Sequence, residues 1–280
     1  MMKKLLMMAA ALAADLSAQS APDYEIYAIR YATIKEFAVS GLIAGADKDR
    51  KMDIAMYVWL IKGGGKNILF DCGFYRDKFM QRWHPAEYMK PSDALKNAGL
   101  KPEDITDVII SHIHWDHADG FDLFPKAKIW IQKDEFEYYS GEAWQTKPGQ
   151  RGRGAGADAE DVLGLVKLNT EGKLGFVRGD AQEIFPGITA YTGGKHTYQS
   201  QFLGVRTAGG VVVLASDNVY LYENLEKHVP IAQTLDAESN VKAQDRMKQI
   251  ATKLEWIVPG HDPAVMRNFP AAGLRVVRIQ

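Results

Sequence analysis

Short runs of β-branched and aromatic residues alternate along the chain with segments of helical character. Three such runs come first, at residues 24–32, 55–61 and 67–71, and the sequence KGGGKN supplies a turn between the last two. Runs of this composition, when bounded by glycine-rich turns, are typical of β-strands. The pattern therefore predicts a strand meander at the start of the chain.

The segment after this meander combines a short helix with a buried strand. Ser92 and Gly99 stand at the two ends of an amphipathic stretch, where we expect an N-cap and a C-terminal stop. The apolar run at 107–112 then predicts a buried strand. The sequence SHIHWDHADG begins where this strand ends, and binding groups commonly stand on such exits because the strand fixes the root of the loop.

The strand pattern returns in the second half of the chain at residues 187–194, 201–208 and 210–217. A long amphipathic stretch at 236–254 predicts a helix, and the sequence EWIVPGH at 255–261 predicts a closing strand. Both halves thus run from strands through a helix to a further strand. This order favours an α/β fold in which two sheets pack face to face with helices on the outside.

Composition sets limits on this fold and its partners. The 280 residues are 46% hydrophobic, enough for a core of ordinary size, and a formal charge of −1 gives no broad positive field for nucleic acid.

The glycine- and arginine-rich stretch at 147–161 predicts a mobile loop, but its glycine spacing is not that of a dinucleotide site. The single cysteine, Cys72, cannot form an intrachain disulfide, and we expect an inert buried thiol.

The first residues predict export from the cytoplasm. Two lysines precede an apolar run from Leu5 to Ala14, and small residues lead from there to Ser20. This is the pattern of a secretory signal peptide, and the run is much shorter than the roughly 20 residues of a membrane-spanning helix. We expect residues 1–20 to be a signal peptide and 21–280 to be a periplasmic or secreted domain without a retained membrane anchor. A frayed cytosolic helix is the alternative.

The sequence SHIHWDHADG concentrates metal-ligating side chains within six positions. A random H-x-H-x-D-H would arise at roughly one start site in a million, and burying these groups together without compensation is costly. A bound cation compensates that cost directly. The four residues are His112, His114, Asp116 and His117.

Further candidate ligands stand at later strand ends, where His196 follows YTGGK, Asp217 ends VVVLASD and His261 ends WIVPGH. Asp217 could bridge two divalent cations, each completed by three other ligands. One set is His112, His114 and His196, and the other is Asp116, His117 and His261. These nitrogen and oxygen ligands fit zinc best, and manganese, iron and cobalt are compatible with them. The remaining histidines, His84 and His228, lack this placement, and we expect surface or packing roles for both.

These residues resemble the metallo-β-lactamase superfamily over about residues 24–266. The motif HIHWDH and the three later ligands are similar to its dinuclear metal site, and Asp71 in FDCG stands at the position of its early strand-end aspartate. The resemblance implies an αββα four-layer sandwich, with two mixed β-sheets face to face and helices outside. Within the superfamily the chain looks most like the N-acyl-homoserine lactone lactonases, and Tyr220 falls where their catalytic tyrosine stands. One departure is GGKHT in place of Pro-Gly-His-Thr, which puts Lys195 beside a ligand. The Lys195 side chain would either add a positive electrostatic field at the site or point to solvent.

The resemblance also implies a reaction, in which a hydroxide bridging two metal ions attacks a lactone carbonyl. Tyr220 would donate a hydrogen bond to the carbonyl oxygen, and Asp116 would shuttle a proton to the leaving oxygen. Asp71 would orient a ligand histidine through its other ring nitrogen. The residues that would line an acyl-chain pocket, or else pack in the core, are Trp115, Trp83 and Phe74.

Several other functions stay open at this point. The nearest are a β-lactamase, a glyoxalase-type thioesterase or an organophosphate triesterase on the same fold. An iron oxygenase or diiron oxidoreductase is less favoured, because such sites usually carry glutamate where this chain has His114. Metal binding without catalysis is a further alternative. The expected partner is a small-molecule acylated lactone or related ester, and a homodimer is left open.

Overall fold

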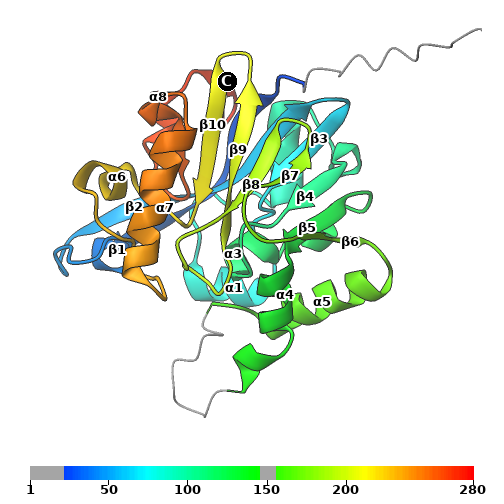
Figure 1. Cartoon of the computed structure of the whole chain (residues 1–280), viewed down its shortest axis with the longest axis horizontal. Helices are drawn as coiled ribbons and strands as arrows, with labels where there is room; N and C mark the ends of the chain where they lie inside the picture. The colour runs from blue at the N-terminus through cyan, green and yellow to red at the C-terminus, as the bar shows by residue number, and fades with distance from the viewer. Residues whose placement is uncertain (1–21, 146–155) are drawn as a thin grey trace, which may run out of the picture.

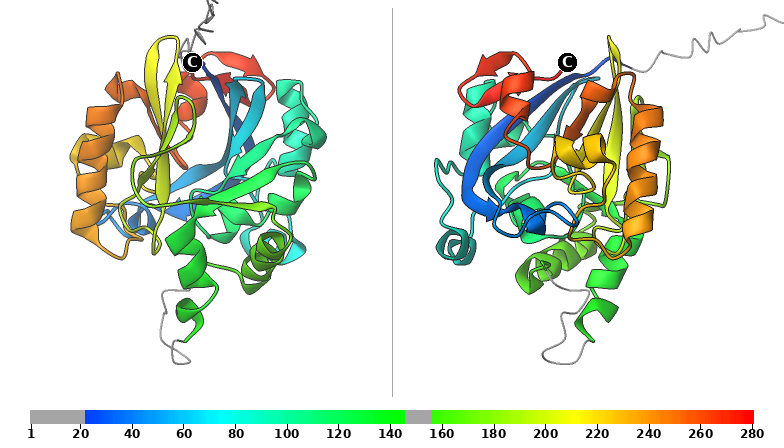
Figure 2. Two further views of the ribbon diagram at one scale, coloured as in Figure 1. Left: turned by 45° about the vertical axis from the view of Figure 1, so that its right-hand side comes forward. Right: turned by 90° about the vertical axis from the view of Figure 1, so that its left-hand side faces the viewer.

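Two β-sheets pack face to face in the computed structural model, which describes residues 22–145 and 156–280, and helices cover the outer faces (Figures 1 and 2). This arrangement confirms the α/β sandwich with two mixed sheets. The predicted signal peptide and residues 147–155 of the predicted loop lie outside the described residues.

The larger sheet has eight strands in the order β12-β13-β1-β2-β3-β4-β5-β6. The first three strands along the chain pair in antiparallel fashion, which is the predicted meander, and β3 to β6 pair in parallel. The strands are β1 (Glu25–Ala38), β2 (Lys51–Gly63), β3 (Lys66–Phe70), β4 (Asp107–Ile109), β5 (Lys128–Gln132), β6 (Leu174–Val177), β12 (Ala271–Gly273) and β13 (Val276–Arg278).

The smaller sheet has five strands in the order β11-β10-β9-β8-β7, and only its β10–β11 pair is parallel. These strands are β7 (Gln182–Phe185), β8 (Ile188–Thr192), β9 (Gln201–Thr207), β10 (Gly210–Ser216) and β11 (Ile257–Pro259). The parallel pairs bring the carboxyl ends of β3 and β4, and those of β10 and β11, to shared edges of the two sheets.

Most helices lie on the outer faces, and α7 runs along the smaller sheet (Figure 1). The helices are α1 (Asp77–Trp83), α2 (Pro91–Ala94), α3 (Trp115–Ala118), α4 (Lys133–Tyr139), α5 (Ala159–Thr170), α6 (Tyr222–Lys227), α7 (Ala237–Ile250) and α8 (Val265–Asn268). The 3-10 turns are η1 (Val39–Gly41), η2 (Leu95–Ala98), η3 (Pro102–Asp104), η4 (Phe121–Leu123), η5 (Glu142–Trp144) and η6 (Leu254–Trp256). In the two described stretches of chain, no helix is long and apolar enough to cross a membrane.

Alternation along the strands divides the buried side chains into layers. Trp59 of β2 lies in the core between the sheets with Leu203 of β9, whereas its neighbour Leu60 lies in the core beneath α2, α4 and α5. On β10, Val213 faces outward to the layer that contains Met247 of α7. Burying each such side chain contributes about 1.5 to 3 kcal/mol, so the layers hold the strand ends in fixed positions.

Some local predictions were wrong in detail. Ser92 is not an N-cap, because α2 begins at Pro91, a residue whose ring fixes φ and whose missing N–H suits the first helical position. The helix predicted to run to residue 254 ends at Ile250, although it begins as expected, with Asp236 accepting a hydrogen bond from the N–H of Ser239 at 3.0 Å. Gly99 does end its helical segment, with φ at 75°.

Candidate metal centre

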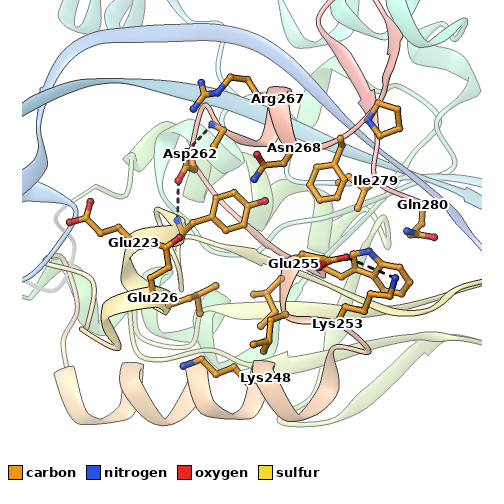
Figure 3. A pocket seen from close by; sticks show the side chains of 18 of the residues that line it. Glu223, Glu226, Lys248, Lys253, Glu255, Asp262, Arg267, Asn268, Ile279 and Gln280 are labelled. Carbon is orange, nitrogen blue, oxygen red and sulfur yellow. Dashed lines mark hydrogen bonds and ion pairs between the residues drawn. The ribbon is translucent and has the colours of Figure 1, made fainter.

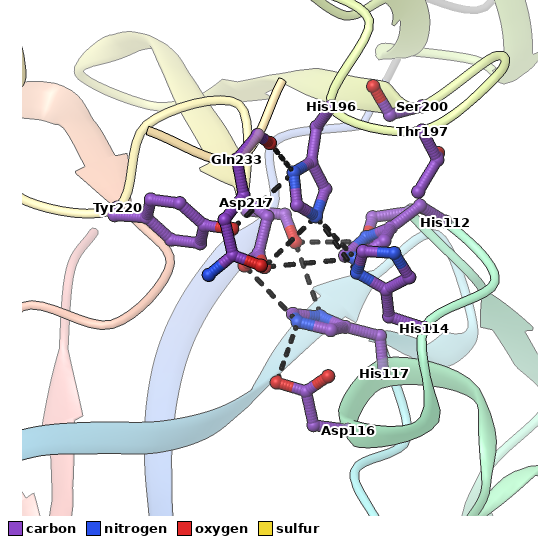
Figure 4. A network of polar contacts seen from close by, with 12 residues as sticks. His112, His114, Asp116, His117, His196, Thr197, Ser200, Asp217, Tyr220 and Gln233 are labelled. Atoms are coloured by element: carbon purple, nitrogen blue, oxygen red, sulfur yellow. Dashed lines mark hydrogen bonds and ion pairs between the residues drawn. The ribbon is translucent and has the colours of Figure 1, made fainter. Parts of the chain in front are cut away.

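The seven predicted ligands lie together, although they come from four separate segments that follow strands β4, β8, β10 and β11. Figure 4 labels all of them except His261. Their ligating atoms form two groups, within each of which all the atoms lie within 4.8 Å of one another. One group is His112, His114, His196 and Asp217, and the other is Asp116, His117, Asp217 and His261. The two sets are those that the sequence analysis expected, and Asp217 belongs to both.

The carboxylate of Asp217 stands between the two groups and turns one oxygen to each. Its Oδ1 lies 2.9 Å from Nε2 of His261 and 3.2 Å from Nε2 of His117. Its Oδ2 lies 3.4 Å from Nε2 of His196 and 3.7 Å from Nε2 of His112. This is the geometry of a carboxylate that can bridge two cations.

Backbone carbonyls fix the orientation of two of the histidines. Nδ1 of His196 lies 2.6 Å from the carbonyl oxygen of Gln233, and Nδ1 of His261 lies 3.0 Å from that of Ala55. A carbonyl can only accept, so each Nδ1 carries the proton and each Nε2 turns a lone pair toward the cluster. Sequence reasoning missed both partners, because a backbone carbonyl leaves no residue-type signal.

Asp71 orients two further histidines through their Nδ1 atoms, one directly and one through Ser111. It is fully buried, and it accepts hydrogen bonds from the backbone N–H of Ser111 at 2.7 Å and from the Ser216 hydroxyl at 2.8 Å. Its Oδ2 also lies 2.8 Å from Nδ1 of His117, the contact expected of an orienting carboxylate. The Ser111 hydroxyl, 2.9 Å from Asp71, extends this arrangement to Nδ1 of His112 at 2.8 Å.

The buried polar atoms of the cluster fit divalent cations. Nε2 of His117 and Oδ1 of Asp217 are buried without a hydrogen-bond partner, which is costly for groups removed from water. Nε2 of His196 also faces two other ring nitrogens, at 3.0 Å from His114 and 3.2 Å from His112. Cations among these atoms would satisfy the lone pairs, so the residues present fit a divalent metal centre.

Electrostatics differ between the two groups. Burial, reinforced by neighbouring histidines, lowers the pKa of His112 well below its usual range, and burial lowers that of His114 to about 3. Both rings are therefore neutral, the form that binds metal. Burial is the largest single influence and acts to lower the pKa of His117 and His261, but the Asp217 and Asp116 carboxylates together outweigh it, so both pKa values are raised. A cation at that place would stabilise the same carboxylate charge.

A cavity of about 440 Å³ opens onto the cluster and is walled by aromatic side chains. Trp83 and Trp115 stack with ring centroids 5.3 Å apart, and Phe37 stacks on Trp83 at 6.2 Å. The prediction that Phe74 lines this cavity is wrong. Phe74 is fully buried and packs edge-on behind Trp115 at 4.7 Å, because the left-handed backbone at Gly73 (φ 68°) turns the chain inward there.

Tyr220 and Asp116 both reach this cavity. The Tyr220 hydroxyl lies 3.4 Å from Nδ1 of His196, but that nitrogen already donates to Gln233, so the hydroxyl can donate into the cavity instead. Burial raises the pKa of Tyr220 well above its usual range, which keeps the donor protonated. Asp116 places Oδ2 3.4 Å from Nε2 of His117.

The end of the predicted loop 147–161 forms part of the cavity wall and begins a helix. The carbonyl of Gly156 accepts the N–H of Trp115 at 3.0 Å, and a Cβ at position 156 would lie 2.5 Å from the His114 ring. Asp158 caps the first turn of α5, so residues 159–161 are helical rather than part of a loop. Sequence reasoning missed this close approach, since one glycine in a glycine-rich stretch gives no distinct signal.

The other singled-out residues lie elsewhere. His84 and His228 end α1 and α6 with left-handed backbones, and both are exposed. Cys72 is a free buried thiol, and burial raises its pKa well above the usual range, as expected of an inert cysteine. The ammonium of Lys195 contacts the carbonyl oxygen of Tyr198 at 2.8 Å, so it is engaged with its own turn.

A larger cavity of about 1470 Å³ lies between α6, α8, η6 and the C-terminal strand (Figure 3). Tyr222, Trp256 and Phe269 contribute apolar surface, and charged side chains of both signs stand around them. None of the described residues that line it is a histidine or one of the seven candidate ligands. The metal centre therefore belongs to the smaller cavity.

Comparison with known proteins agrees with this geometry. Residues 55–261 match the family model described as the metallo-beta-lactamase superfamily, and the chain belongs to that superfamily. An N-acyl homoserine lactonase of Bacillus cereus is 34% identical over 171 residues, covering 60% of each chain. The lactonase AttM of Agrobacterium fabrum is 28% identical over 197 residues, covering 64% of this chain and 66% of its own. The chain thus spans about 60% of the length of the first of these curated relatives.

Solved structures show the same fold. A mutant of Bacillus thuringiensis AiiA with N-decanoyl-L-homoserine at its active site aligns with a TM-score of 0.70 at 22% identity, covering 89% of this chain and 97% of that one. AidC, described as a dizinc quorum-quenching lactonase in complex with its product, aligns with a TM-score of 0.67 at 16% identity, covering 87% and 89%.

Proposed function

We propose that this protein is a metal-dependent hydrolase that opens the lactone ring of N-acyl-homoserine lactones. One observation carries the proposal: the two ligand groups that share Asp217 open, with Tyr220, into a cavity walled by aromatic side chains. The polar end of that cavity suits an ester, and its apolar walls suit an acyl chain. The named activity of the curated relatives supports this substrate over a β-lactam, thioester or phosphotriester.

We propose zinc as the cation, with two ions per chain. The ligands are imidazole and carboxylate groups, a set that zinc binds well, and the neighbour AidC is described as a dizinc enzyme. When bound, such cations supply a Lewis acid for the ester carbonyl and lower the pKa of a coordinated water.

The chain's own side chains then act on the substrate. Tyr220 donates a hydrogen bond to the carbonyl oxygen as negative charge develops on it, and its raised pKa keeps that proton in place. The Asp116 carboxylate, at the cavity surface, accepts the proton that the attacking water gives up and passes it to the departing ring oxygen. Trp83 and Trp115 hold the acyl chain and exclude water.

Acid release during lactone opening tests the proposal. Metal-free protein reloaded with zinc is expected to release one proton for each N-hexanoyl-homoserine lactone opened, and the chelator-treated protein is the control. A cephalosporin, a thioester and a phosphotriester are assayed in parallel. Hydrolysis of one of these without lactone opening would assign the chain to another hydrolase of the superfamily, and no metal-dependent hydrolysis would contradict the proposal.

We further propose that the chain is exported to the periplasm or secreted, on the strength of its first 20 residues. Expression of the full chain in a Gram-negative host, followed by fractionation and N-terminal sequencing, tests this. Export predicts a mature protein that begins close after Ser20, whereas an intact N-terminus in the cytosolic fraction would contradict it. A homodimer stays a prediction, which light scattering of the purified protein tests.

A further inference from the structure

A buried carboxylate that the proposed reaction does not use lies between two of the histidine-bearing segments. Glu135, in the first turn of α4, has no exposed surface. It accepts hydrogen bonds from the N–H of Ile113 at 3.1 Å, the hydroxyl of Thr197 at 2.6 Å and the N–H of Gln199 at 2.6 Å. A side chain this buried needs partners for its charge, and here it finds three donors.

The positions of those donors give the carboxylate a specific place in the metal centre. Ile113 stands between His112 and His114, and Thr197 directly follows His196. Glu135 therefore ties together the segments that carry all three histidines of one ligand group. None of these bonds is made by a residue next to His261, and in the segment after β4 the bond is made at Ile113, between His112 and His114, and not within α3, which carries Asp116 and His117.

The charge of Glu135 matters as well as its shape. All three partners are donors, so a carboxylate satisfies them, whereas an amide would turn its own N–H groups toward at least one of them. Burial raises the pKa of Glu135 to about 7, and the hydrogen bonds and the nearby Lys195 charge oppose that shift. The ammonium of Lys195 contacts Oε1 of Gln199 at 2.9 Å, on the same turn that Glu135 holds. Lys195, the departure from the family motif, is thus placed to balance the buried charge.

We propose that Glu135 is a positioning residue, which sets the His196 imidazole against those of His112 and His114 and so determines the metal affinity of that ligand group. Lys195 assists by holding the turn and balancing the charge. The inference rests on the proposed metal-dependent function, and it concerns one of the two ligand groups only.

Other contacts keep these segments docked when Glu135 is changed. The backbone N–H of Gln201 donates to the carbonyl of Ser111 at 2.9 Å, and its side chain donates to that of Ile110 at 2.8 Å. Tyr138 of α4 stacks on Tyr198 with ring centroids 4.1 Å apart. We therefore expect Glu135→Gln to fold, and to disturb the position of His196 rather than the sandwich.

Titration of the metal-free protein with Co²⁺, followed by visible absorption, tests the proposal. Glu135→Gln is expected to weaken one class of site by about 10- to 100-fold, as the loss of a residue that orients ligands does, and to leave the second class unchanged. Glu137→Gln is the matched control, since Glu137 lies on the same helix but is exposed and pairs with Lys133. It should bind both ions as the wild type does, and circular dichroism of the metal-free variants checks their folding.

A second pair of variants covers the case in which Glu135→Gln does not fold. Thr197→Val removes one hydrogen bond to Glu135 at constant volume, and should weaken the same class of site by a smaller factor, whereas Thr197→Ser keeps the hydroxyl and should restore it. Wild-type affinity at both sites in Glu135→Gln, or equal loss at both, would overturn the proposal. A wild type that opens no lactone while its variants show the selective weakening would refute the proposed function and support the inference.

Discussion

Two of the cavities that the described residues form differ in size and in what lines them. The larger, of about 1470 Å³, has carboxylates with ordinary partners: Glu223 pairs with Arg50 at 2.6 Å, and Asp262 accepts the N–H of Tyr222 at 3.0 Å. The smaller, of about 440 Å³, is lined by Asp217, whose Oδ1 is buried without a hydrogen-bond partner.

The volume of a cavity alone therefore does not identify a chemical site. A bound cation adds little stability to a cavity whose charged groups are paired or solvated. It adds much more to a buried set of ligands whose lone pairs have no partner. We therefore assign the proposed metal binding and catalysis to the smaller cavity.

Replacing the shared ligand should have the largest effect. Asp217→Asn keeps the size of the side chain, but it leaves one oxygen where two face the two ligand groups. We expect metal content to fall to one ion per chain or fewer and turnover to fall by about 1000-fold or more, since metal ions supply several kcal/mol of transition-state stabilisation. Elemental analysis and lactone hydrolysis measure both, and two retained ions would refute the bridging role.

Removing the tyrosine hydroxyl should spare the metal and impair the reaction. Tyr220→Phe loses the donor that faces the cavity, so turnover should fall by roughly 100- to 1000-fold, the usual effect of losing one oxyanion donor. Metal content, measured on the same samples, should stay at the wild-type value. Unchanged turnover would show that Tyr220 does not contact the reacting carbonyl.

Weakening the support of the ligands should have an intermediate effect. Asp71→Asn loses the charge that orients His117, and we expect metal affinity to fall by about 10- to 100-fold. Asp107→Asn is the matched control, because Asp107 is also buried but pairs with Lys66, away from the histidines. The two variants are compared by chelator competition. Equal metal loss in both would indicate a general effect of removing a buried carboxylate.

One substitution in each cavity gives the smallest expected effects and the most direct contrast. Trp83→Ala removes a stacked wall of the smaller cavity, and kcat/KM for long-chain lactones should fall by about tenfold, with less effect on short chains. Leu254→Ala, in the larger cavity, removes an exposed leucine and should leave kcat/KM unchanged for every chain length. A loss of activity in Leu254→Ala would make the larger cavity part of the site.

The ligands themselves could be predicted because their signals are local. HIHWDH is a dense motif, and the three later ligands each follow an apolar run that forms a strand, so the convergence of strand ends brings them together. The sandwich could be predicted for the same reason, since its strands are long and strongly patterned. Short elements such as β12 and β13, three residues each, carry too few positions for a pattern.

What supports the ligands could not be predicted from these patterns. Gln233 and Ala55 act through backbone carbonyls, which every residue has, and the role of Glu135 depends on a helix that packs against two distant loops. The error at Phe74 has a similar origin, because the alternation of side chains stops where the backbone turns left-handed after β3. Sequence patterns thus locate the candidate ligands, and tertiary packing determines which groups orient them.

The central claim is that the two ligand groups hold a pair of divalent cations on either side of Asp217. Anomalous X-ray diffraction from crystals of the zinc-loaded protein, recorded on both sides of the zinc absorption edge, tests it most directly. We expect two peaks, one within His112, His114 and His196 and the other within Asp116, His117 and His261, each in contact with one oxygen of Asp217. A map without peaks at these positions, with the histidines in direct contact with Asp217, would contradict it.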